Sequence, residues 1–178
     1  MSELSFIKFN QELPELISFM TNNHWEFHAN PRPTEKQIVE AFQSGWYEED
    51  RETFWIEKQN EKIGLIIIHD ISDTIPLFDI RLANDVRGKG YGTKAVKWLI
   101  DYIFSLPDRK IRIEAHTRSD NLAMRKTLSH CGFVKEGYFR QAWENTDGTV
   151  SDSICYAIIR SDWENQVVTP IKLNEWPF

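Results

Sequence analysis

The chain has 178 residues, of which 41% are hydrophobic and 27% are charged, an ordinary composition for one globular domain with a sizeable core. Its formal net charge of −6 argues against broad nucleic-acid binding, because such binding depends on neutralising phosphates with basic side chains. No apolar run approaches the roughly 18 residues that cross a bilayer, and the first residues lack a secretory pattern. We therefore expect a cytoplasmic protein with no nucleic-acid or membrane partner.

The first half of the chain predicts two helices and a group of strands. Thr34 is the expected N-cap of the second helix, and Gly45 ends it. A short polar turn after residue 58 favours a β-hairpin, and a third strand extends it into an antiparallel meander. In chain order we expect a strand at 4–9, a helix at 11–23, a break at 30–34, the second helix, and strands at 53–58, 62–71 and 76–83.

The second half predicts a helix that reaches toward Pro107, a strand, another helix and a closing hairpin. The strand covers 110–117, the helix 121–133, and the hairpin 133–160 around the turn signal NTDGT. A strand, a helix and a strand in succession place the two strands in parallel through a right-handed crossover. The sheet is therefore expected to be mixed.

A glycine-rich junction, Arg87 to Thr93, stands between the third strand and the long helix. Glycine lets the backbone turn sharply, and the N–H groups that open a helix attract phosphate. A plain tight turn is the simpler interpretation, but it requires neither three glycines nor two basic residues. A Walker A loop is excluded because Gly90 follows Lys89 where a hydroxyl residue is needed. A Rossmann loop is disfavoured because Thr93 stands at the third glycine's place and three antiparallel strands precede it.

Two motifs carry a resemblance to a known family. Arg87 to Gly92 matches the [QR]-x-x-G-x-[GA] signature of the GNAT superfamily of acyl-CoA-dependent N-acyltransferases, and Asn121 precedes Gly132 by eleven residues, as in that family's second motif. Over residues 4–160 the order of elements is also similar. Leu128, the Asp120-Asn121 pair and the closing stretch to Trp163 resemble the RimJ/RimL-like branch.

The resemblance implies an α/β (α+β) three-layer fold with a mixed, mostly antiparallel sheet of about seven strands and about four helices. Residues 1–163 would form the GNAT domain and residues 164–178 a C-terminal extension. That extension could pack on the domain or on a second subunit, and the second case would give a homodimer. The two strands around the long helix are expected to splay apart and receive the pantetheine arm of the cofactor.

Acetyl-CoA is the cosubstrate that the resemblance implies, with its pyrophosphate on the junction. Backbone groups of Leu82 and Ala83 would meet the pantetheine arm, and one N–H there would polarise the thioester carbonyl. Further cofactor contacts are expected from Asn121 and Arg125. The implied cofactor residues are Leu82, Ala83, Arg87, Gly88, Lys89, Gly90, Tyr91, Gly92, Thr93, Asn121 and Arg125.

Transfer requires a neutral amine, and at pH 7 a lysine-type amine is neutral at only about the 10⁻³ level, an α-amine roughly a tenth of the time. Glu114 and Asp79 are the preferred bases, with His116 and His28 as further candidates; structural ion pairs are the alternative for the strand residues. Many family members have a tyrosine acid where this chain has Leu128, so no general acid is assigned. Leu77 likewise replaces a glutamate common in RimL-like sequences.

The segment between the first two helices covers the acceptor site in related enzymes. Trp25, Glu26, His28 and also Tyr138 are the expected substrate-binding residues, although core packing equally accounts for Trp25. No metal is expected, because prolines interrupt the helix that His24 and His28 would need to form a zinc site. The two cysteines, Cys131 and Cys155, are expected to be reduced and buried.

The expected function is acetyl transfer from acetyl-CoA to a primary amine by direct attack in a ternary complex. The acceptor is either a protein N-terminal amine or a small amine, such as a polyamine or an aminoglycoside. Acidic residues at positions 26 and 48–50 would favour a cationic acceptor if they formed a pocket, but they could equally be a solvated face. The alternative function is a non-catalytic acyl-CoA-binding module.

Overall fold

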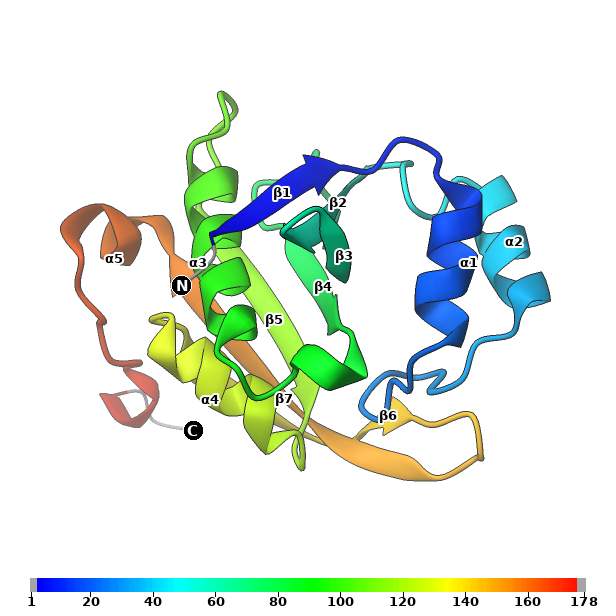
Figure 1. Ribbon diagram of the computed structural model, residues 1–178. Helices are drawn as coiled ribbons and strands as arrows, with labels where there is room; N and C mark the ends of the chain where they lie inside the picture. Colours follow the sequence, from blue (N-terminus) through cyan, green and yellow to red (C-terminus); the bar gives the residue numbers. More distant parts are fainter. Residues whose placement is uncertain (1–2, 176–178) are drawn as a thin grey trace.

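The computed structural model describes residues 3–175 and has one seven-stranded sheet with the order β1-β2-β3-β4-β5-β7-β6 (Figure 1). Residues 1–2 of the expected domain and 176–178 of the expected extension lie outside the described residues. Neighbouring strands in the described chain are antiparallel except β4 and β5, so the expected mixed sheet is confirmed. The strands are β1 Leu4–Lys8, β2 Arg51–Lys58, β3 Glu61–His69, β4 Leu77–Leu82, β5 Arg112–Arg118, β6 Val134–Glu144 and β7 Val150–Ile159.

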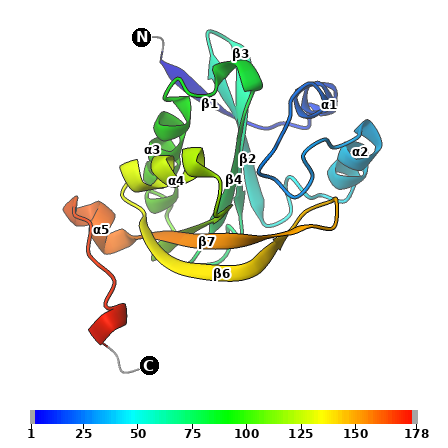
Figure 2. The same ribbon diagram turned by 90° about the horizontal axis from the view of Figure 1, so that it is seen from below.

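Helices cover both faces of the sheet. Figure 2 shows α3 and α4 on one side of strands β2 to β4 and α1 and α2 on the other, with the β6–β7 hairpin running beneath. The α-helices are α1 Leu13–Thr21, α2 Glu35–Gln43, α3 Tyr91–Phe104, α4 Leu122–His130 and α5 Arg160–Asn165. The three expected layers are confirmed, and α5 is an element that the sequence did not predict. None of the described helices is both long and apolar enough to span a bilayer.

Two hydrophobic cores lie on opposite faces of β2 and β3. Side chains alternate between the faces of a strand, so Phe54 and Ile56 pack against α3 while Trp55 between them packs under α1 and α2. On β3, Ile66 and Ile68 join the α3 core, and Leu65 and Ile67 join the other. Both faces are buried, which explains the uninterrupted apolar run in β3.

Local signals in the sequence mark several element boundaries. Thr34 is the N-cap of α2, as predicted, and it also forms a capping box with Gln37. Gln59 and Asn60 have positive φ angles of 52° and 66° and turn β2 into β3. Helix α3 ends at Phe104, shortly before Pro107, which the sequence suggested as its end. Both cysteines are free and buried, as expected.

Strands β4 and β5 separate almost immediately. Their parallel register contains one pair, Leu77 with Glu114, whereas β3 and β4 pair over six positions. The backbone edges of β4 and β5 therefore face each other without a continuous ladder beyond this pair. The splay that the resemblance implied is confirmed.

Candidate active site

The junction before α3 forms a backbone cradle for an anion. Gly88 and Gly90 have φ angles of +74° and +81°, which glycine adopts without steric cost, and Gly90 is the N-cap of α3. The bond from Lys94 N to Gly90 O, 3.3 Å, begins the helical ladder. The N–H groups of Tyr91, Gly92 and Thr93 belong to the first turn and have no helical acceptor. This arrangement suits a phosphate or pyrophosphate.

A cavity of about 380 Å³, here called the α3 cavity, opens beside this cradle. It brings together seven of the predicted cofactor residues: Leu82, Arg87, Gly88, Gly90, Gly92, Thr93 and Asn121. Trp25, Glu26 and His28 from the α1–α2 segment line it as well, so the predicted cofactor and substrate residues meet. The predicted cofactor residues Ala83, Lys89, Tyr91 and Arg125 are not part of this lining.

The hydrogen bonds of Ala83 and Arg125 explain why these two residues do not line the α3 cavity. Ala83 donates its N–H to Ile63 O at 2.9 Å and accepts from Val86 N at 3.2 Å, so both backbone groups are engaged. Arg125 donates from Nη1 to Ser119 O at 2.7 Å and is held at the end of β5. These bonds hold both residues away from the lining of the α3 cavity.

The end of β4 presents a different backbone group. Leu82 O accepts from Arg87 Nε at 2.9 Å. Backbone groups alternate in direction along a strand, and the N–H of Ala83 points toward β3. The N–H of Leu82 therefore points the other way, into the gap between β4 and β5.

Arg87 connects the junction to the α1–α2 segment. Its Nη2 donates to His24 O at 2.7 Å, and its guanidinium lies 5.3 Å from the ring centroid of Trp25. Burial lowers the pKa of Arg87, while Glu26 opposes this change. This basic residue is therefore engaged by backbone carbonyls and by the Trp25 ring, and the cradle for an anion comes from the N–H groups.

Asn121 is tied into the start of α4. Its Oδ1 accepts from Met124 N at 3.1 Å, and its Nδ2 donates to Thr117 Oγ1 at 3.1 Å. The second motif of the sequence is thus an N-cap that also joins α4 to β5.

A second cavity, of about 450 Å³, is called here the Asp79 cavity. It shares five lining residues with the α3 cavity: Phe27, His28, Ile80, Asn121 and Met124. The two hollows therefore adjoin near the place where β4 and β5 separate. A group bound in one can approach a group bound in the other.

Asp79 is the most strongly perturbed acid of this cavity. Its Oδ2 lies 3.2 Å from Arg81 Nη2 and 3.4 Å from His28 Nδ1. Burial alone would raise the pKa of Asp79, but Arg81 and His28 outweigh it and hold the pKa well below the usual range. Asp79 is therefore ionised, and its Oδ1 is buried without a hydrogen-bond partner among the described residues.

His69 is a site residue that sequence reasoning missed. It ends β3 at the wall of the Asp79 cavity, and its Nδ1 accepts from Arg51 Nε at 2.9 Å. Burial lowers the pKa of His69; Asp79 opposes this, and Arg51 adds to it. The sequence contained one signal for this residue: it is a single polar residue at the end of an apolar strand.

The other two predicted bases lie on β5. Glu114 accepts from Arg112 Nε at 2.7 Å and lines neither cavity, whereas His116 lines the Asp79 cavity with its Nε2 at 3.6 Å from Glu114 Oε2. Glu114, His116 and Cys155 place one possible metal ligand each within 4.8 Å of one another. The Arg112 guanidinium already occupies that carboxylate, which disfavours a cation there.

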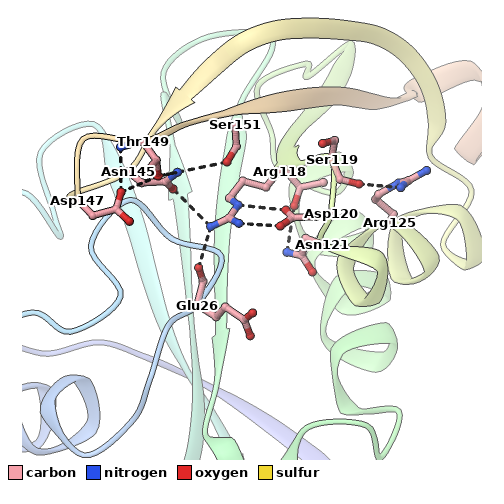
Figure 3. Close-up of polar contacts among 11 residues, drawn as sticks. Glu26, Arg118, Ser119, Asp120, Asn121, Arg125, Asn145, Asp147, Thr149 and Ser151 are labelled. Carbon is pink, nitrogen blue, oxygen red and sulfur yellow. Dashed lines mark hydrogen bonds and ion pairs between the residues drawn. The ribbon is translucent and has the colours of Figure 1, made fainter.

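Arg118 fastens the α1–α2 segment over the site. Its Nη1 donates to Glu26 O at 3.1 Å and to Asn145 Oδ1 at 3.4 Å (Figure 3). Its guanidinium also lies 5.4 Å from the Phe27 ring centroid. Asp120 completes the arrangement with an ion pair of 2.7 Å. One side chain at the end of β5 thus joins three segments that are distant in sequence.

The remaining candidates for acid chemistry lie elsewhere. Leu128 is fully buried in the α3 core. Burial raises the pKa of Cys131 to about 11. Tyr138, a predicted substrate residue, is 59% exposed, bonds to Asp152, and lines a separate surface hollow on β6. Tyr138 therefore lies outside both cavities.

A backbone anion cradle, a splayed strand pair and an adjoining polar cavity define a site for transfer from a phosphorylated carrier. The acetyltransferase (GNAT) domain family matches residues 4–134, and the chain belongs to this family. This membership supports the acyltransferase class that the motifs predicted.

One relative and several solved structures are similar to this chain. The uncharacterised N-acetyltransferase p20 of Bacillus licheniformis is 33% identical over 76 residues, 43% of this chain and 42% of that protein, so the match spans less than half of the relative. A spermidine N-acetyltransferase chimera of Vibrio cholerae SpeG and hSSAT has a TM-score of 0.79 at 21% identity, covering 92% of this chain and 99% of that one. The Vibrio cholerae spermidine N-acetyltransferase with CoA and spermine has a TM-score of 0.76 at 21% identity, covering 91% and 98%. At this identity the likeness shows the fold.

Proposed function

We propose that the protein transfers the acetyl group of acetyl-CoA to a primary amine by direct attack in a ternary complex. Acetyl-CoA occupies the α3 cavity with its pyrophosphate on the N–H groups that open α3, and the amine enters the Asp79 cavity. The observation that carries the proposal is that the two cavities share five lining residues at the β4–β5 gap. The acetyl group and the amine therefore meet there without a covalent enzyme intermediate.

We propose His28 as the base, with Asp79 as its positioning residue. The Nδ1 of His28 lies 3.4 Å from the ionised Asp79, an arrangement in which Nδ1 carries the proton and Nε2 is free to accept one. His28 lines both cavities. His116 is the second candidate because it lines the Asp79 cavity, and Glu114 is the third because Arg112 occupies its carboxylate.

The thioester needs a donor for the negative charge that develops on its carbonyl oxygen. Support for the Leu82 N–H comes from its direction into the β4–β5 gap, whereas the N–H of Ala83 is engaged with Ile63. Such a fixed donor contributes about 3 kcal/mol to transition-state stabilisation. The amine gives its proton to His28 as the C–N bond forms, the C–S bond breaks, and the departing CoA thiolate takes a proton from water.

The type of acceptor separates two versions of this proposal. The resemblance to the RimJ/RimL-like branch favours a protein N-terminal amine, whereas the names of the solved neighbours point to spermidine and spermine. Both versions share the same cofactor site and the same attack. They differ in what the Asp79 cavity must recognise beyond the amine.

Thiol release from acetyl-CoA with a panel of amines tests the proposal. We expect release that depends on both the enzyme and an amine, with the acetylated amine identified by mass spectrometry. Calorimetry with CoA provides the matching binding measurement. CoA binding without thiol release for any amine would instead support the non-catalytic module.

Three further expectations stay proposals. The first is a division into an acetyltransferase domain at 1–163 and an extension at 164–178, the second a cytoplasmic location, and the third a homodimer. The start of the extension is held to the domain by Thr169, whose N–H donates to Asp162 Oδ2 at 2.9 Å. Sedimentation of the full chain and of a chain ending at residue 163 would test whether the extension determines the oligomeric state.

A further inference from the structure

The walls of the Asp79 cavity carry few acidic groups for a polycation. Asp79 and Asp70 are the carboxylates in its lining, and Asp79 is already paired with Arg81. The acidic run at 48–50 does not contribute, because Glu48 and Asp50 line a neighbouring hollow of about 360 Å³ instead. The acidic pocket that would have favoured a cationic acceptor is therefore not formed in the Asp79 cavity.

Arg51 lines both the Asp79 cavity and the neighbouring hollow, and so brings a positive charge to the boundary between them. Its Nε donates to His69 Nδ1 at 2.9 Å and its Nη1 to Glu49 O at 2.8 Å. Within residues 3–175, Arg51 forms no ion pair with a carboxylate. Both of these bonds go to neutral acceptors, so the guanidinium can still attract an anion.

Two polar atoms in the lining of the Asp79 cavity lack hydrogen-bond partners, and they suit a ligand that carries both an amine and an anion. The Nε1–H of Trp143 is a buried donor without a partner in the described chain, and Asp79 Oδ1 is a buried acceptor in the same condition. Buried polar groups are usually hydrogen-bonded, so these atoms need partners from a ligand or from water. The acceptor oxygen suits the N–H of an amine, and the donors suit a carboxylate.

We propose that the acceptor is a small amine that also carries a carboxylate, such as a free amino acid, with the carboxylate directed to Arg51 and Trp143. This inference rests on the proposed function. A cavity of about 450 Å³ is large enough for a molecule of that size. Spermidine lacks the anion, and a protein N-terminus has only a distant carboxylate, so both should be poorer acceptors.

Matched amines test the inference. Lysine, histidine and tryptophan are each compared with the amino acid amide and with the decarboxylated amine, in the thiol-release assay at pH 7.5. For at least one of these side chains we expect the free amino acid to have a kcat/KM at least about tenfold above both partners, as one charge-assisted hydrogen bond can provide. The amide has the less basic amine, so this preference cannot arise from amine ionisation.

Two variants locate the source of the preference. Arg51→Gln should lose about tenfold or more in kcat/KM for the amino acid and little for its amide, whereas Lys8→Gln, on the neighbouring hollow, should leave both unchanged. CoA affinity and melting temperature verify that Arg51→Gln is folded.

The outcomes separate the two proposals. Equal or faster turnover of amides, decarboxylated amines, spermidine or N-terminal peptides would overturn the carboxylate inference while acetyl transfer stands. An Arg51→Gln variant that keeps the full preference would overturn it too. Thiol release with none of these amines, despite normal CoA binding, would count against the proposed function itself.

Discussion

The α3 cavity and the Asp79 cavity adjoin but are built in different ways. The first depends on the backbone of one short segment, Gly88 to Thr93, and on the helix that it opens. The second depends on charged and aromatic side chains from several strands and from the α1–α2 segment. In the proposed function, cofactor binding is therefore a property of local backbone conformation, whereas recognition of the acceptor is a property of the tertiary structure.

This difference predicts how each region responds to substitution. Changes in the α3 cavity should act through backbone conformation and affect cofactor affinity. Changes around Asp79 should act through charge and hydrogen bonding and affect stability or turnover. Four variants test the comparison, from the largest expected effect to the smallest.

Asp79→Asn should lower the free energy of unfolding by about 3 kcal/mol at pH 7, because Arg81 keeps its charge and loses its ionised partner. Asp79 has a folded pKa below its unfolded value of about 3.9, so its contribution is present above that pH and is lost as the pH falls further. Urea unfolding at pH 7, 4 and 3 measures this. The exposed Asp85→Asn is the control, and an equal loss at all three pH values would contradict the ion-pair assignment.

His28→Gln should lower kcat by about 100-fold, the usual contribution of a positioned base, with CoA affinity nearly unchanged. Single-turnover acetyl transfer measured alongside CoA calorimetry separates the two quantities. His130→Gln, at the exposed end of α4, should behave like the wild type. If the His28 variant kept full kcat, His28 would not be the base, and His116 or Glu114 would take its place in the proposal.

Gly90→Val should weaken CoA binding by about tenfold or more, equal to about 1.4 kcal/mol, because it disturbs the cradle. Gly148→Val is a closely matched control: both glycines have φ of +81°, and a Cβ at either would meet no atom within 4 Å. Only Gly90 of this pair lines the α3 cavity. If calorimetry gave the two variants equal CoA affinity, the pyrophosphate would not bind at the junction.

Arg118→Gln should raise KM for the amine by about fivefold, the equivalent of about 1 kcal/mol, because the segment that carries Phe27 and His28 loses its fastening. The chemical step should change less. Arg140→Gln, exposed on β6, provides the comparison. If KM stays constant while faster proteolysis appears between residues 22 and 33, Arg118 stabilises the segment without positioning it for the acceptor.

The sequence by itself determined local features of the fold, including those around the proposed cofactor site. Helix caps, glycine spacing and strand alternation act over a few residues, so Thr34, Gly90 and Asn121 could be assigned to their elements before any fold was known. The mixed sheet followed from the order of these elements.

Only the tertiary structure decided the make-up of the Asp79 cavity, the proposed acceptor site. His69 and Arg51 meet through the antiparallel pairing of β2 with β3, and Asp79 meets His28 across 51 positions of the sequence. The pattern of one strand does not show which distant side chain will oppose it, nor whether a charge will find a partner. Burial and pairing set the charge state of Asp79 and His69, and both arise only when the chain has folded.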